Sequence, residues 1–177
     1  MNYFIISYSV MLTLLYKVIY FSKLKLNPMN SYINGHLHIN NGLAVFGDNF
    51  RTRSGSFINI NEGKLTVGNN VFLNRNVSIN CRVQVNIGSD VMFGENVCIY
   101  DHDHRFDNRE LLIREQGYTS SSVVIGNNVW IGSNSVILKG VSIGNNSVIA
   151  AGSVVFSDIP ENTIMYAKKT NVYKAIV

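Results

Sequence analysis

Apolar side chains recur every six residues over two long tracts of the chain. The later tract keeps this period without a break at Ile125, Ile131, Ile137, Ile143, Ile149 and Val155. The earlier tract keeps it, with one slip of two residues, at Val67, Leu73, Ile79, Ile87, Phe93 and Ile99. A fixed short period identifies a repeat architecture before any local assignment is made. The pattern predicts triangular coils, each built from three six-residue units and stacked into a parallel β-helix.

The fifth position of each repeat is also small or β-branched, and it is predicted to point into the coil beside the first position. The fifth positions are Val71, Val77, Val83, Val91, Val97, Ser135, Val141, Ser147 and Ser153. Asparagine pairs at 69–70, 127–128 and 145–146 stand where the chain must turn, because asparagine tolerates positive φ. Paired strands lie about 4.8 Å apart, so the pattern from Phe46 to Pro160 predicts about five coils and a prism about 24 Å tall.

The composition favours a protein that buries its flat faces against copies of itself. Of the 177 residues, 46% are hydrophobic and only 15% are charged. The net charge is +4, and most lysines lie near the two ends of the chain, which argues against a nucleic-acid groove. Cys81 and Cys98 fit no metal spacing, and they are predicted to be outward-facing, reduced thiols of a cytoplasmic protein.

Three segments are expected: an apolar helical segment at 1–25, a coil domain at 26–165 and a tail at 166–177. Residues 3–21 repeat apolar side chains at helical spacing. They lack the charged start and the cleavage site of a secretory signal, and a lysine at position 17 disfavours a membrane span. Two arrangements are favoured: a helix packed on the base of the coil or in a trimer, and a helix lying on a membrane surface; a membrane span is the third and least expected arrangement.

The six-residue period fails over residues 100–124, which are predicted to form one extended loop. Long loops without a period of their own are most often functional. This loop begins with Asp101, His102, Asp103 and His104, the densest titratable cluster of the chain. An imidazole can take and return a proton near neutral pH, and a neighbouring carboxylate can fix its tautomer. The alternatives are solvated loop histidines and a metal site, which would need a third ligand from elsewhere.

The repeat and the loop together resemble the hexapeptide-repeat acyltransferases, in particular the maltose and galactoside O-acetyltransferases and the acetyltransferases of polysaccharide clusters. The resemblance covers about 64–160 and rests on IGNNVWIGSNSVILKGVSIGNNSVIAAGSVV at 125–155 and DIPEN at 158–162. It implies left-handed coils, and therefore an all-β, left-handed parallel β-helix with an N-terminal helix and one extended loop. It also implies a homotrimer, acetyl-coenzyme A as co-substrate and no metal.

The resemblance assigns roles around the loop. One loop histidine of the family is the general base, and an alignment without gaps places His104 there, with His102 as a neighbour or second candidate. Asn74 falls on an asparagine that contacts the acceptor. Arg82 stands where the galactoside enzyme has an acceptor-binding aspartate, which suggests a different sugar, such as an acidic one. Asp101 is grouped with these acceptor-binding candidates.

The resemblance places acetyl-coenzyme A in the groove between neighbouring coils, where Ser133 and Ala151 match contact positions. Trp130 is expected to pack at the same wall, and Lys168 and Lys169 are candidates for the coenzyme phosphates. The expected function is acetyl transfer to a sugar hydroxyl in surface polysaccharide biosynthesis, on a small-molecule or lipid-linked acceptor in the cytoplasm or at the inner face of its membrane. The alternatives are a γ-class carbonic anhydrase-like zinc protein and a non-catalytic β-helix scaffold.

Overall fold

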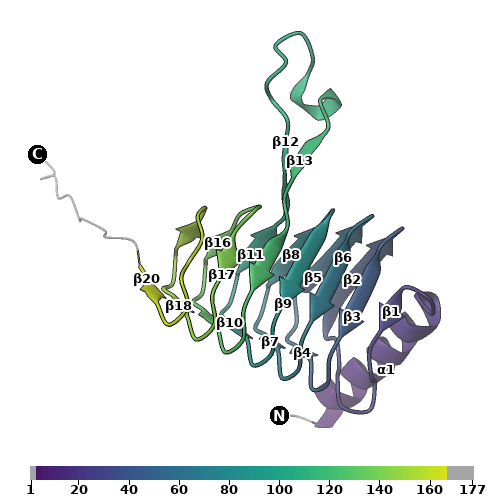
Figure 1. Cartoon of the computed structure of the whole chain (residues 1–177). Coiled ribbons are helices and arrows are strands. Elements are labelled where there is room, and N and C mark those ends of the chain that lie inside the picture. The colour runs from purple at the N-terminus through teal and green to yellow at the C-terminus, as the bar shows by residue number, and fades with distance from the viewer. Residues whose placement is uncertain (1–2, 167–177) are drawn as a thin grey trace, which may run out of the picture.

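The structure, a computed structural model, describes residues 3–166 and consists of three parallel sheets wrapped into a left-handed triangular prism (Figure 1). Sheet 1 contains, in order, β1 (Leu24–Lys25), β3 (Leu43–Phe46), β6 (Lys64–Val67), β9 (Gln84–Ile87), β14 (Val123–Ile125) and β17 (Ser142–Ile143). Sheet 2 contains β4 (Arg51–Thr52), β7 (Phe72–Leu73), β10 (Met92–Phe93), β15 (Trp130–Ile131), β18 (Val148–Ile149) and β20 (Ile164–Met165). Sheet 3 contains β2 (Gly35–Asn40), β5 (Ser56–Asn61), β8 (Ser78–Cys81), β11 (Cys98–Tyr100), β16 (Val136–Ile137) and β19 (Val154–Val155).

The predicted β-helix is confirmed, and it is one coil longer than the repeat suggested. Each sheet holds six strands. The extra coil is built by residues 24–46, where β1 and β2 pair with β3 and β5 although the six-residue period is weak there. Strand pairing alone satisfies the backbone of such a coil, so it forms without a regular repeat of side chains.

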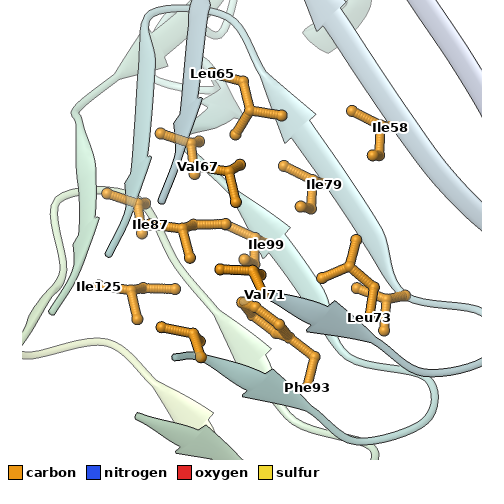
Figure 2. Packing of buried hydrophobic residues seen from close by; sticks show 14 of the residues in the cluster. Ile58, Leu65, Val67, Val71, Leu73, Ile79, Ile87, Phe93, Ile99 and Ile125 are labelled. Atoms are coloured by element: carbon orange, nitrogen blue, oxygen red, sulfur yellow. The ribbon is translucent and has the colours of Figure 1, made fainter. Parts of the chain in front are cut away.

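The first positions of the repeats stack inside the prism as predicted (Figure 2). Side chains with no exposed surface include Leu73, Ile79, Ile99, Ile131, Ile137 and Ile149. Most fifth positions are buried beside them, with valines before the loop and mainly serines after it. Each coil therefore presents the same apolar layer to the next, which is why the core is continuous along the prism.

One coil departs from the predicted inward positions. Val83 is 45% exposed, whereas Cys81 is 1% exposed and was wrongly predicted to face outward. The reason is the two-residue slip of the repeat: β8 runs on to Cys81, which pairs in register with the buried Ile60 of β5, and Val83 then lies on the corner. Cys98 is partly exposed, and both thiols are free.

The predicted asparagine pairs stand at corners of the prism, and Asn70, Asn128 and Asn146 lie in the left-handed region at φ of 57°, 53° and 56°. Asn76, Asn96 and Asn134 have φ between 57° and 59°. Their side-chain amides form a ladder, with the Asn76 Nδ2 donating to Asn96 Oδ1 at 3.1 Å and the Asn96 Nδ2 donating to Asn134 Oδ1 at 3.0 Å. The ladder links successive coils at the place where the strand pairing stops.

The helix α1 (Tyr3–Ile19) lies across the N-terminal end of the prism (Figure 1). Thr13 Oγ1 accepts a hydrogen bond from the backbone N–H of Ile33 at 2.8 Å, and the Tyr16 hydroxyl donates to the Gly35 carbonyl at 3.0 Å. The helix thus packs on the base of the coil, one of the two arrangements favoured above. Within residues 3–166, no helix is long and apolar enough to cross a membrane.

The loop leaves the prism after β11, at the corner between sheets 3 and 1, and projects away from it (Figure 1). Its two arms form an antiparallel hairpin, β12 (His102–His104) and β13 (Tyr118–Ser120), with a short 3₁₀ helix (Ile113–Glu115) near the tip. The predicted loop is therefore confirmed in place, but its root is a strand pair rather than irregular chain.

Candidate active site

A buried carboxylate anchors the root of the hairpin. Asp101 follows β11 and has no exposed surface. Its oxygens accept hydrogen bonds from the backbone N–H groups of Arg82 at 2.8 and 3.0 Å, Val83 at 2.7 Å and Gln84 at 2.9 Å. These donors belong to the corner of the preceding coil, so Asp101 fixes the hairpin to the prism. A side chain with no exposed surface cannot contact an acceptor, and the predicted substrate-binding role of Asp101 does not fit this position.

His102 is the histidine whose tautomer is set by the protein. Its Nδ1 lies 2.8 Å from Asp101 Oδ1, and its side chain is 18% exposed. Because a carboxylate only accepts hydrogen bonds, Nδ1 carries the proton and Nε2 is left as the basic nitrogen. This is the arrangement in which an acidic partner orients a general base.

His104 is the hairpin histidine that is exposed to solvent. It lies two residues after His102 on β12. Its ring centroid is 4.5 Å from that of Tyr118, and the Tyr118 and His102 rings form a T-shaped pair with their centroids 5.4 Å apart. His104 lines an open pocket of about 280 Å³, together with Asp103, Arg105, Phe106, Asp107, Thr119 and Lys139.

Tyr118 joins the predicted residues into one cluster. The Arg82 guanidinium carbon lies 3.9 Å from the centre of the Tyr118 ring, and an Arg82 nitrogen lies 3.9 Å from a Glu62 carboxylate oxygen. A cation over an aromatic face is held by the ring quadrupole. Arg82, Asp101, His102 and His104 are therefore brought together, with Tyr118 packed among three of them.

Lys139 ties the hairpin to the coil on its other side. Its ammonium group pairs with the Asp103 carboxylate, which lies between the two histidines in the sequence. Lys139 follows β16 at the corner between sheets 3 and 1, so it comes from the coil that follows the hairpin. The hairpin is thus held from the preceding coil by Asp101 and from the next coil by Lys139.

The other predicted residues lie on a different edge of the prism. Asn74 follows β7, Ser133 follows β15 and Ala151 follows β18, all at the corner between sheets 2 and 3. Trp130 lies beside this corner on the outer face of sheet 2 and is 53% exposed. Its neighbour in register, Met92, is 54% exposed, so the outer wall is apolar. Exposed apolar side chains beside small residues suit the groove expected for acetyl-coenzyme A.

The structure does not bring this edge to the histidines within one chain. The hairpin leaves the corner between sheets 3 and 1, whereas Asn74, Ser133 and Ala151 share the corner between sheets 2 and 3. Lys168 and Lys169 lie outside the described residues. Within residues 3–166, no group of three or more histidine, cysteine, aspartate or glutamate side chains is placed to hold a metal ion.

The free thiol nearest the cluster is not a nucleophile. Burial and the neighbouring Asp101 carboxylate raise the pKa of Cys81 to about 12. A thiol reacts through its thiolate, so Cys81 stays unreactive near neutral pH. This chemistry disfavours a covalent acyl-enzyme at the root of the hairpin.

Comparisons with known proteins agree with this fold. A family model described as bacterial transferase hexapeptide (six repeats) matches residues 122–157, the coils that follow the hairpin. WbbJ of Escherichia coli strain K12, named for O-acetyl transfer in lipopolysaccharide biosynthesis, is 34% identical over 143 residues, which cover 76% of this chain and 73% of WbbJ. The chain belongs to the hexapeptide-repeat transferase family. The predicted family is thereby confirmed.

Two further relatives of this chain carry acetyltransferase in their names. A Saccharomyces cerevisiae protein is 43% identical over 111 residues, or 62% of this chain. An acetyltransferase of Vibrio cholerae, solved in complex with acetyl-coenzyme A, has 32% identity and a TM-score of 0.50 over 73% of this chain. The chain spans 55% of the length of the yeast relative and 63% of the Vibrio chain.

Sequence reasoning missed two residues of this cluster, Tyr118 and Lys139. Tyr118 lies in the aperiodic loop. It pairs with His104 in a hairpin of only three residues per strand, which is too short to produce a recognisable sequence pattern. Lys139 did leave a signal, since it is the only charged residue between positions 122 and 157. An isolated charge inside a strict apolar repeat deserved to be treated as a site candidate.

Proposed function

We propose that this protein transfers an acetyl group from acetyl-coenzyme A to a hydroxyl group of a sugar, in a site completed by a second copy of the chain. The observation that carries the proposal is the hairpin itself, which holds two histidines at the side of the prism and fixes them from two coils. The relatives named as acetyltransferases support the reaction, and WbbJ supports an acceptor in surface polysaccharide biosynthesis. The proposed location is the cytoplasm or the inner face of its membrane.

In this reaction His104 is the general base. Its ring accepts the proton of the acceptor hydroxyl while the hydroxyl oxygen attacks the thioester carbonyl; the new C–O bond forms, the C–S bond breaks, and the proton passes on to the thiolate. His104 is assigned this role because it lines the open pocket. Asp101, His102 and Arg82 act as positioning residues, since each meets Tyr118 directly or through a neighbour. His102 remains the second candidate because it has the orienting carboxylate.

The homotrimer is proposed on two grounds. The histidines and the candidate coenzyme residues lie on different edges of one prism, and a threefold arrangement places one edge of each copy against another edge of its neighbour. The hairpin also exposes large apolar side chains near its tip: Phe106 is 76%, Leu112 57% and Ile113 58% exposed. Contact with a neighbouring copy would bury them.

The first test measures acetyl-coenzyme A turnover against a panel of sugars and nucleotide-linked sugars. With an active acceptor, His104→Ala is expected to lower kcat/KM by about 10²- to 10⁴-fold, the usual contribution of a general base. His38→Ala is the matched control, because His38 is an exposed histidine on β2 outside the cluster. Full activity in His104→Ala with loss in His102→Ala would transfer the role of base to His102. Activity in both variants would refute the proposed mechanism.

A complementation experiment tests the shared site. His104→Ala removes the base and leaves the coil edge intact, whereas Ala151→Trp fills the coil edge and leaves the hairpin intact. Each variant alone is expected to be inactive, and mixed oligomers formed on co-expression regain activity at the interface where both native halves meet. No recovery in oligomers proven to be mixed would place the whole site in one chain.

Stoichiometric zinc in the purified protein would favour the carbonic anhydrase alternative. Lack of thermal stabilisation by coenzyme A would favour the scaffold.

A further inference from the structure

The helix α1 turns its polar side inward and its apolar side outward. Ser9, Thr13, Tyr16 and Tyr20 recur at helical spacing on the side that meets the first coil. The opposite side carries exposed apolar side chains: Met11 (63%), Leu14 (47%), Leu15 (53%) and Val18 (76%), with Ile19 (59%) beside them and Phe21 (84%) just past the helix end. A helix on a soluble core normally shows the reverse polarity.

The inward hydroxyls have a structural reason. The first coil ends in strand edges whose N–H and C=O groups have no further strand to pair with. The Tyr16 hydroxyl accepts from the Leu37 N–H at 3.2 Å and donates to the Gly35 carbonyl, and the Tyr20 hydroxyl donates to the Leu37 carbonyl at 3.4 Å. Capping the edge fixes the polar side inward, and the aliphatic side is then turned away from the protein.

The charge around this apolar face has one sign. The first 47 residues contain no aspartate or glutamate, and their charged side chains are Lys17, Lys23 and Lys25. Lys17 donates to the Leu26 carbonyl at 2.9 Å, and Lys25, in the strand just after the helix, is exposed. A second copy laid face to face would bring lysines toward lysines without a carboxylate to pair them. An anionic lipid surface complements both the apolar face and the lysines.

We propose that α1 is a membrane-surface helix: its outer face of Met11, Leu14, Leu15, Val18 and Phe21 enters the headgroup region of an anionic bilayer, with the prism standing on that surface. A helix with one apolar face flanked by lysines suits a position in the plane of the interface. This proposal is independent of the acetyl-transfer chemistry, because the hairpin and the coil edge lie outside α1. It accounts for an apolar face that the capping role alone does not require.

Vesicle flotation with the purified full chain tests the proposal. Wild-type protein is expected to float with vesicles of phosphatidylcholine and phosphatidylglycerol, and its partitioning is expected to fall about tenfold or more with phosphatidylcholine alone or in Val18→Glu. Phe156→Glu is the matched control: Phe156 is 76% exposed, like Val18, and follows β19 near the far end of the prism. Lys23→Gln with Lys25→Gln is expected to weaken binding to anionic vesicles about tenfold.

Two results would overturn the proposal. One is that wild-type protein does not bind anionic vesicles. If Val18→Glu then also halves the particle mass, the apolar face is a contact between copies of the chain. The other is vesicle binding that Val18→Glu and Phe156→Glu leave equally strong. Circular dichroism and thermal melting of each variant verify the fold, and a soluble-acceptor assay verifies that catalysis is separate from membrane binding.

Discussion

The coils after the loop and the hairpin inside it are built on opposite principles. In residues 123–157 every inward side chain has an equivalent above or below it, and the same strand pairing repeats from coil to coil. The hairpin has no such redundancy: one carboxylate, one aromatic ring and one ion pair hold it in place. The coil is therefore a source of rigidity, and the hairpin is a place where single residues carry single functions.

This difference predicts separable effects of mutation. A change inside the coil is expected to lower stability and leave the activity of the remaining folded molecules intact. A change in the hairpin is expected to lower activity and leave thermal unfolding nearly unchanged. Asp101 is the informative exception, because it belongs to both regions.

Replacement of Asp101 by alanine is expected to have the largest combined effect. It leaves the backbone N–H groups of Arg82, Val83 and Gln84 without their acceptor, which costs about 3–5 kcal/mol of unfolding free energy. It also removes the partner of His102, so activity falls about tenfold or more. Thermal unfolding at fixed protein concentration and steady-state kinetics measure the two losses.

The stability control for this variant is Asp103→Ala, which removes a partly exposed carboxylate two residues away. It is expected to cost less than about 1 kcal/mol of stability. An equal loss of stability in both variants would contradict the anchoring role given to the buried hydrogen bonds of Asp101.

Ile137→Ala tests the coil alone. Ile137 is fully buried and pairs with Ile99 below and Val155 above. Deleting its outer atoms leaves a cavity that the stacked coils cannot close, and about 2–5 kcal/mol of unfolding free energy is lost. Activity per folded molecule is expected to stay within about twofold of wild type. Val136→Ala, on the outward side of the same strand, is the control, and a large loss of kcat in Ile137→Ala would show that coil and hairpin are coupled.

Lys139→Gln loosens the hairpin from the next coil. A partly exposed ion pair contributes little stability, so the unfolding free energy should change by less than about 1 kcal/mol. The activity should fall about threefold, since His104 is no longer held from that side. Lys139→Arg is expected to restore most of it. Equal activities in all three proteins would remove Lys139 from the site.

The sequence predicted what repetition determines. The six-residue period is visible in the amino-acid sequence. It predicts inward positions such as Ile79 and Ile131 and corner asparagines such as Asn96. The place of the extended loop followed from the failure of the same period. The first coil followed only in part: residues 26–46 were assigned to the coil domain, and apolar residues alternate along β2, but no six-residue period indicated the pairing of β2 with β5.

The site was predicted less completely, because its contacts occur once. The burial of Asp101 depends on three N–H groups from a corner about twenty residues earlier, and nothing in the local sequence marks that corner as a binding partner. Tyr118 reaches the histidines only through the hairpin pairing. The orientation of α1 could not be predicted either. Helical spacing defines a polar and an apolar face, and the unpaired strand edge of the first coil determines which face turns inward.

The smallest effect at neutral pH concerns Cys81, the core residue that touches the site. Its pKa is raised to about 12 from 9.0 by burial and by Asp101, so the unfolded chain loses this proton at lower pH than the folded chain. Stability from this group is therefore complete below pH 9 and declines between pH 9 and 12, by up to about 1.4 kcal/mol per pH unit. Cys81→Ala is expected to flatten this decline, as measured by thermal unfolding across that range.

At pH 8 a thiol reagent should modify Cys98 in the folded protein and Cys81 only after unfolding. Rapid labelling of Cys81 in the folded state would mean that the corner held by Asp101 opens, and that the root of the hairpin is less rigid than the coil beneath it.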